Sequence, residues 1–237
     1  MPSFSDLKSS TLEVIPGLLQ ISARYTNLFL IFEKDLTLID TGFGSSVPLI
    51  QRAIRDRGRS IDELKLVLFT HNHTDHTGGL AKLQRLARFQ TAMHSHDIVA
   101  DPRDLYPENW LLGRMLMHGP FKNRFMLDKS RIDIVLAGGE SFDVLGGMQV
   151  INTPGHTPGS ISFYFPAHKL LIAGDAVGSR HGQLQLPRKS VSRNMVQAAD
   201  SIRVVSQLDI AILCKGHGRP IMQNAAAELY KLVSGFN

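Results

Sequence analysis

The feature that most constrains this chain is a six-residue stretch, residues 71–76, that reads HNHTDH and carries three histidines and one aspartate. Imidazoles and carboxylates are unfavourable in an apolar core, because each buried polar atom needs a partner. The preceding run LKLVLFT (64–70) predicts a buried strand, and the following GGLAKLQRLAR (78–88) predicts an amphipathic helix. The cluster is therefore predicted to lie on a strand-to-helix loop, where something must satisfy its polar atoms.

Composition narrows the kind of site that this loop can form. The chain has 237 residues, 43% of them hydrophobic, which is ordinary for a packed globular protein. Its one cysteine, Cys214, is expected in the core, and it excludes an internal disulfide framework and any multi-thiolate zinc site. A bound metal would therefore use nitrogen and oxygen ligands.

Charge and hydropathy also limit the partners. The net charge is +5, but the basic residues are dispersed, so no specific nucleic-acid partner is predicted. No run approaches the roughly 18 apolar residues of a membrane span, and the first residues lack a cationic start followed by a long apolar run. We therefore expect no membrane association and a cytoplasmic location.

The pattern along the chain predicts strands in each half, followed by helices. Residues 25–42 predict two strands joined by a turn at 33–35, followed by a helix over about 47–58. The segment from about 97 to 130 is irregular and rich in proline, and we interpret it as an inserted lid. The elements predicted after it are strands within 131–155, 160–177 and 209–216 and helices over about 191–207 and 223–234. This order predicts two facing sheets with helices outside, in one domain, 1–237.

Three further polar residues each follow an apolar strand and lie beside glycine. They are His156 in NTPGHTPGS, Asp175 in LLIAGDAVG and His217 in AILCKGHGRP. Glycine allows the sharp turns and close backbone approach that convergent ligands need. Any one of these residues alone is more often an ordinary loop residue.

Taken together, these residues resemble a known family. HNHTDH followed by His, Asp and His at strand ends resembles the HxHxDH, H, D, H series of metallo-β-lactamase-fold hydrolases, and DTGFG (40–44) resembles their first motif. The order and loop contexts match over almost the whole chain. The resemblance implies an α+β fold, the αββα sandwich. Two mixed β-sheets pack face to face in it, with helices on both outer faces and all ligands at one edge.

The resemblance also implies two divalent metal ions and seven ligands. The implied ligands are His71, His73 and His156 for one ion, Asp75, His76 and His217 for the other, and Asp175 as a bridge. Asp75 and Asp175 would also position a hydroxide, Asp75 could give a proton to the leaving group, and Asp40 would fix the orientation of a ligand. Zinc is the favoured metal, although imidazole and carboxylate ligands accept iron and manganese as well.

Two such ions would generate a bridging hydroxide and polarise a carbonyl, so the implied reaction is hydrolysis of a small ester, lactone or thioester, with weak β-lactamase side activity. The alternatives are an iron-dependent oxidoreductase similar to the persulfide dioxygenases of this fold, and a phosphodiesterase. We expect neither an appended flavin domain nor the carboxy-terminal helical domain with which glyoxalase II enzymes hold glutathione.

The expected substrate contacts are less specific than the ligands. Tyr106 and Trp110 belong to the inserted segment, His118 is a weak candidate there, and His181 follows Asp175 on an expected loop. The apolar residues of that segment favour a small-molecule carbonyl substrate with an acyl part, but they could equally form core or a homodimer contact. His94 and His96 match no motif and are interpreted as strand or loop residues.

Overall fold

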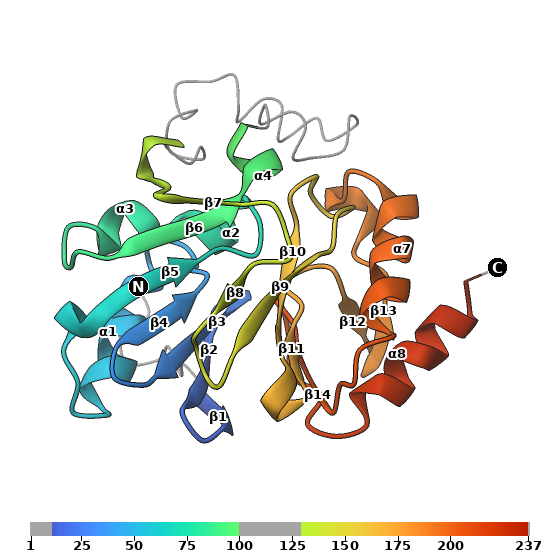
Figure 1. Cartoon of the computed structure of the whole chain (residues 1–237), viewed down its shortest axis with the longest axis horizontal. Coiled ribbons are helices and arrows are strands. Elements are labelled where there is room, and N and C mark those ends of the chain that lie inside the picture. The colour runs from blue at the N-terminus through green and yellow to red at the C-terminus, as the bar shows by residue number, and fades with distance from the viewer. Residues whose placement is uncertain (1–10, 100–128, 237) are drawn as a thin grey trace, which may run out of the picture.

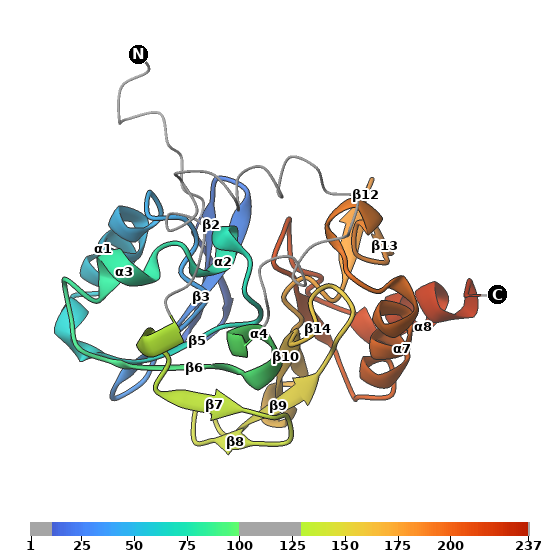
Figure 2. The ribbon, with the colours of Figure 1, turned by 90° about the horizontal axis from the view of Figure 1, so that it is seen from above.

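The computed structural model describes residues 11–99 and 129–236 and shows two β-sheets packed face to face. Helices α1 and α3 cover the outer face of the first sheet, and α7 and α8 cover the outer face of the second (Figure 1). The view from above shows the same four layers, with the two sheets in the middle (Figure 2). The αββα sandwich that the sequence predicts is therefore confirmed.

The first sheet has seven strands in chain order. They are β1 (Thr11–Ile15), β2 (Leu18–Ala23), β3 (Thr26–Phe32), β4 (Leu36–Ile39), β5 (Leu64–Leu68), β6 (Gln90–His94) and β7 (Ile134–Leu136). Neighbours from β1 to β4 are antiparallel, whereas those from β4 to β7 are parallel. The carboxyl ends of β4, β5 and β6 therefore meet at one edge.

The second sheet is also mixed. Its strands, in spatial order, are β14 (Ile212–Cys214), β11 (Leu170–Ile172), β10 (Ile161–Phe165), β9 (Met148–Asn152) and β8 (Ser141–Phe142). Only β11 and β14 are parallel neighbours, so these two strands also end at a common edge. A separate hairpin is formed by β12 (Gly178–Arg180) and β13 (Gln183–Gln185).

The described helices are mostly short. The α-helices are α1 (Val47–Arg55), α2 (Thr74–Thr77), α3 (Leu80–Leu83), α4 (Ser95–Val99), α7 (Met195–Val205) and α8 (Ala225–Ser234). The 3₁₀ helices are η2 (Ile61–Glu63), η3 (Lys129–Arg131), η4 (Pro166–His168) and η5 (Lys189–Val191). Within residues 11–99 and 129–236, no helix has the length and apolar character needed to cross a membrane.

Alternation along the strands divides the core into three apolar layers. Phe29 of β3 and Phe163 of β10 belong to the buried cluster between the sheets, which also contains Cys214, as expected. Leu28 and Leu30 of β3 point to the opposite face and join the cluster beneath α1 and α3. A third cluster joins the second sheet to α7 and α8. Both sheets are therefore buried on both faces.

Three local predictions were wrong. The helix expected after the Gly-Gly pair ends at Leu83, and Leu86 lies in a turn beyond it with 38% of its surface exposed. The loop expected after Asp175 contains the β12–β13 hairpin, which places His181 at its tip. His96 lies in α4, not in a strand or loop.

Candidate metal centre

Polar residues from both sheets collect at one edge of the sandwich. Asp40 and the loop that begins at Thr70 follow the parallel strands β4 and β5, and Asp175 and His217 follow the parallel strands β11 and β14. The carboxyl ends of parallel strands are the usual place for a site in such sheets, because the loops there converge.

Backbone hydrogen bonds fix the two sheets to each other at this edge. The Ile161 amide donates to the Thr70 carbonyl (2.9 Å), and the Asn27 amide donates to the Gly216 carbonyl (2.7 Å). The Asn27 side chain also donates to the Lys215 carbonyl (2.9 Å). The loops of the first sheet are thereby held at a set position against those of the second.

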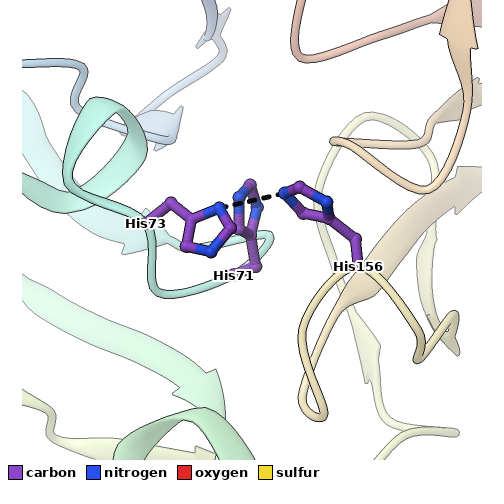
Figure 3. Close-up of side chains that lie close together, drawn as sticks. All are labelled: His71, His73 and His156. Carbon is purple, nitrogen blue, oxygen red and sulfur yellow. Dashed lines mark hydrogen bonds between the residues drawn. The ribbon is translucent and has the colours of Figure 1, made fainter. Parts of the chain in front are cut away.

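A three-histidine group, His71, His73 and His156, lies at this edge and is buried. The ring centroids of the three side chains are 4.6 to 4.8 Å apart. His156 Nε2 faces His73 Nδ1 at 2.9 Å, and the His71 ring lies beside this pair (Figure 3). Two residues come from one loop and the third from a loop of the other sheet.

A second cluster, which we call the outer group, consists of Asp75, His76 and His217. Asp75 Oδ2 is 3.6 Å from Nε2 of both histidines. One turn of helix, α2, carries Asp75 and His76 away from the extended segment that holds His71 and His73. One loop therefore supplies side chains to both groups.

Asp175 lies between the two groups. Its Oδ2 is 3.4 Å from Nε2 of His156 in the three-histidine group and 3.0 Å from Nε2 of His217 in the outer group. Its Oδ1 is 3.6 Å from His76 Nε2. This is the position that a bridging carboxylate requires.

Hydrogen bonds behind the first loop set which ring nitrogen faces the cluster. Asp40 accepts from the Thr70 amide (2.9 Å), from the Thr70 hydroxyl (2.8 Å) and from His76 Nδ1 (2.7 Å). Because the hydroxyl of Thr70 gives its one hydrogen to Asp40, His71 Nδ1 must be the donor in its 3.0 Å bond to that oxygen. Neutral His71 and His76 therefore present the lone pair of Nε2.

The second half of the chain repeats this arrangement. The hydroxyl of Ser192 donates to the Arg188 carbonyl (2.8 Å), so His156 Nδ1 is the donor in its 3.0 Å bond to Ser192. His217 Nδ1 donates to the carbonyl of Tyr25. Neutral His156 and His217 likewise direct the Nε2 lone pair into the cluster.

Two atoms of the cluster are left without a partner. Of the buried side-chain nitrogen and oxygen atoms in residues 11–99 and 129–236, three have no hydrogen-bond partner, and His71 Nε2 and Asp175 Oδ1 are two of them. Buried acceptors are rarely left unpaired in proteins, because desolvation is costly. The ligand atoms of His71, Asp175 and His76 lie within 4.8 Å of one another, and a nitrogen lone pair beside a carboxylate oxygen in such a cluster fits a divalent metal ion.

Glycine keeps room for this arrangement. A Cβ atom built on Gly216 would overlap Asp175 Oδ1 and would lie 2.9 Å from His76 Cε1. The residue before His217 therefore cannot carry a side chain unless the cluster moves.

The electrostatics of the two groups differ. Burial, together with the neighbouring imidazoles, lowers the pKa of His156 to about 3 and holds the pKa of His71 well below its usual range. Burial also disfavours charge on His76, but Asp40, Asp75 and Asp175 outweigh it and raise the pKa of this imidazole to about 10. The carboxylates therefore attract a cation to the side of the site that holds the outer group.

The structure brings together all seven side chains that the resemblance implies as ligands, and it places Asp40 in contact with His76. It does not bring His181 to them, since this residue is exposed and no hydrogen bond or ion pair joins it to the cluster within the described ranges. The other expected substrate contacts, Tyr106, Trp110 and His118, lie outside the described residues, as does most of the predicted lid.

Several supporting groups were not found from the sequence. Thr70 and Ser192 set the orientation of histidines, and the Tyr25 carbonyl does so through the backbone. Thr70 directly precedes the histidine cluster, which is the only signal that points to it. Asp97 was also missed, although it follows the apolar strand β6 just as the other polar residues follow theirs.

The comparison with protein families agrees with this geometry. The sequence matches the Metallo-beta-lactamase superfamily over residues 21–217, which is most of the chain. The chain belongs to this superfamily. The match spans the strand-end motifs from Asp40 to His217, so the superfamily's motif region and the observed cluster coincide.

Relatives within the superfamily cover nearly all of the chain. It is 26% identical to the probable metallo-hydrolase YflN of Bacillus subtilis, over 99% of this chain and 96% of that protein. It is 29% identical to the acyl-coenzyme A thioesterase MBLAC2 of Gallus gallus, over 91% and 79%. The crystal structure of the metallo-beta-lactamase family protein TTHA1429 from Thermus thermophilus superimposes with a TM-score of 0.70 at 22% identity, covering 94% of this chain and 80% of that one. This structural likeness supports the fold.

Proposed function

We propose that this member of the metallo-beta-lactamase superfamily is a binuclear metal-dependent hydrolase that cleaves a small ester, lactone or thioester. The observation that carries the proposal is the pair of buried, unpartnered atoms His71 Nε2 and Asp175 Oδ1 within a convergent set of imidazoles and carboxylates. The donor set consists of nitrogen and oxygen only, which favours zinc and also accepts iron or manganese.

The proposed ligand assignment follows the two groups. The three-histidine group would hold one ion, the outer group would hold the other, and Asp175 would contact both, because its carboxylate lies near members of each. When bound, such ions supply a Lewis acid for the substrate oxygen and lower the pKa of water from 15.7 to about 7.

Three carboxylates of the protein would transfer the proton and hold the ligands in place. Asp75 is the more exposed of the two cluster carboxylates (27% of the side chain, against 12% for Asp175), so we assign the Asp75 oxygen that does not bind the ion to accept the proton of the attacking water and pass it to the leaving group. The pKa of Asp175 lies well below its usual range because the surrounding imidazoles outweigh its burial, so this carboxylate stays ionised and holds its neighbours in place. Asp40 keeps His76 in one orientation.

The thioester part of the proposal is supported by the chicken relative that is named an acyl-coenzyme A thioesterase and is 29% identical to this chain. The ester and lactone parts rest on shared chemistry, since all three substrates present an acyl carbonyl to the same nucleophile. Hydrolysis of β-lactams would be a weak side activity of this site.

The test is a substrate panel on protein loaded with zinc, manganese or iron. It would contain an acyl-coenzyme A, S-lactoylglutathione, an acyl-homoserine lactone, nitrocefin and bis-p-nitrophenyl phosphate, with metal content measured in parallel. We expect about two equivalents of metal and the highest kcat/KM on an acyl ester, lactone or thioester. A preference for the phosphodiester would replace the proposal with a phosphodiesterase. Oxygen consumption with a persulfide, confined to the iron form, would replace it with an oxidoreductase.

A further inference from the structure

A buried carboxylate outside the candidate ligand set lies beneath the loops of the three-histidine group. Asp97 belongs to α4, directly after β6, and its surface is 0% exposed. Its Oδ2 accepts from the Asn72 amide (2.8 Å) and from the Thr157 hydroxyl (2.7 Å), and its Oδ1 accepts from the Gly159 amide (2.6 Å). A buried carboxyl is costly unless its oxygens have hydrogen-bond partners, so these three contacts are needed for Asp97 to remain buried here.

The three donors belong to the two loops that carry the three-histidine group. Asn72 lies between His71 and His73, and Thr157 directly follows His156. The Asn72 side chain also donates to the backbone carbonyl of Asp97 (3.0 Å). Asp97 therefore joins the loop that carries His71 and His73, in the first sheet, to the loop that carries His156, in the second sheet.

The fit around this carboxylate is tight. A Cβ atom built on Gly159 would lie 2.6 Å from the Asp97 amide nitrogen and 2.7 Å from its Oδ1. The close approach of the His156 loop therefore depends on glycine at this position. The contact resembles that of Asp40, which binds Thr70 and His76 on the other side of the same loop.

We propose that Asp97 is a positioning residue that sets the spacing of the three-histidine group by clamping its two loops together. The inference rests on the proposed function, because it concerns the same metal centre. It predicts that loss of the clamp weakens one metal site selectively. In Asp97→Asn the amide nitrogen would face either Gly159 N–H, or Asn72 N–H and the Thr157 hydroxyl, so at least one loop would lose its acceptor.

The experiment compares metal dissociation constants, measured by competition with a chromophoric chelator, and the visible spectra of the Co²⁺-loaded proteins. The variants are Asp97→Asn, Thr157→Val, which removes one donor only, and the control Asp133→Asn. Asp133 accepts comparable bonds from the Thr91 amide (2.8 Å) and hydroxyl (2.9 Å) at the start of β6, away from the cluster. We expect Asp97→Asn to weaken metal binding at the three-histidine group about tenfold or more and to change the Co²⁺ bands of that site, as the loss of groups that orient ligands does elsewhere.

Thr157→Val should show a smaller shift at the same site, and Asp133→Asn should leave both constants within about twofold of the wild type even if it unfolds at a lower temperature. The clamp is refuted if Asp97→Asn and Thr157→Val both keep wild-type constants and spectra. If Asp97→Asn does not fold, Thr157→Val decides alone. A wild-type protein that binds no divalent ion would overturn the proposed function as well, whereas two bound ions that are indifferent to these variants would overturn the clamp only.

Discussion

The two halves of the centre differ in burial and in charge. In the three-histidine group the His156 side chain is 1% exposed, whereas in the outer group that of His217 is 45% exposed. In the first group, burial together with the neighbouring imidazoles lowers the pKa of His156 to about 3 and holds the pKa of His71 well below its usual range. The outer group contains a carboxylate and lies near two more, which raise the pKa of His76 to about 10 against the effect of its burial.

This difference predicts different roles for the two proposed ions. An ion held by the three-histidine group would lie among buried side chains, and the lowered pKa values of His71 and His156 mean that it would displace few protons from these two ligands. An ion in the outer group has an exposed side and must compete with protons. We therefore expect the first ion to be retained and the second ion to exchange and to meet substrate.

The largest effect should come from removing the side chain of Asp175, which the two halves share. In Asp175→Ala we expect both ions to be lost and kcat/KM to fall by about 10³-fold or more, because metal activation is worth several kcal/mol and about 1.4 kcal/mol corresponds to a factor of ten. Elemental analysis and steady-state kinetics measure this. The control is Asp200→Ala, an exposed residue that pairs with Arg203 on α7. Retention of either ion with turnover in Asp175→Ala would show that this carboxylate is not shared.

Removal of metal tests directly whether the two halves retain their ions differently. During dialysis against a chelator, we expect one equivalent to leave early together with the activity, and the second to leave later together with a fall in Tm. An ion present at 100 times its dissociation constant stabilises the fold by about 2.7 kcal/mol. Metal content, activity and Tm are followed over time. Simultaneous loss of both equivalents would mean that the two halves do not differ in retention.

A change that acts mainly on the outer group should sharpen the comparison. In Gly216→Ala the new Cβ would displace the His76 ring as well as Asp175 Oδ1, so we expect the affinity of the outer ion to fall by about 10- to 100-fold and that of the ion in the three-histidine group, which shares only Asp175, to fall less. Gly44→Ala is the matched control, because its Cβ would meet nothing closer than the Gly78 carbonyl at 3.7 Å. Chelator titration measures both constants. Equal weakening of the two sites would contradict a selective effect.

The smallest effect is expected at Tyr25, whose backbone carbonyl, not its ring, accepts from His217. The ring is exposed, so Tyr25→Ala should leave both dissociation constants within about twofold of the wild type. A larger loss at the outer site would assign the positioning of His217 to the ring.

The sequence predicted the strand ends of the site better than the groups behind them. Polar residues that follow apolar strands, such as Asp175 and His217, stand out in the sequence, whereas their assignment to two ions depended on the family resemblance. Asp97 could not be found in this way, because two of its three donors are backbone amides that leave no mark in the sequence. Asp97 also lacks the neighbouring glycine that marks Asp175 and His217, so its local pattern is that of an ordinary loop residue.

Two errors in the predicted secondary structure also have physical causes. The β12–β13 hairpin is largely polar, with Leu184 as its one buried apolar residue, so no alternation marked it as strand. Leu80 and Leu83 are buried as their spacing predicts, but the spacing does not show where helical hydrogen bonding stops, and α3 ends at Leu83 with Leu86 exposed beyond it. The single domain, the lid, the cytoplasmic location, the homodimer and the lack of a nucleic-acid partner stay predictions.

The distribution of the candidate ligands along the chain bears on when, during synthesis, the proposed ions could bind. Residues 71–76 contribute four of the seven side chains, and the second sheet contributes the other three. A nascent polypeptide that has passed residue 76 could hold an ion only loosely, because each group also needs a histidine made much later. Under the proposed function, metal loading would therefore be a late event in biogenesis, and a bound ion would join side chains of the two sheets once both have formed.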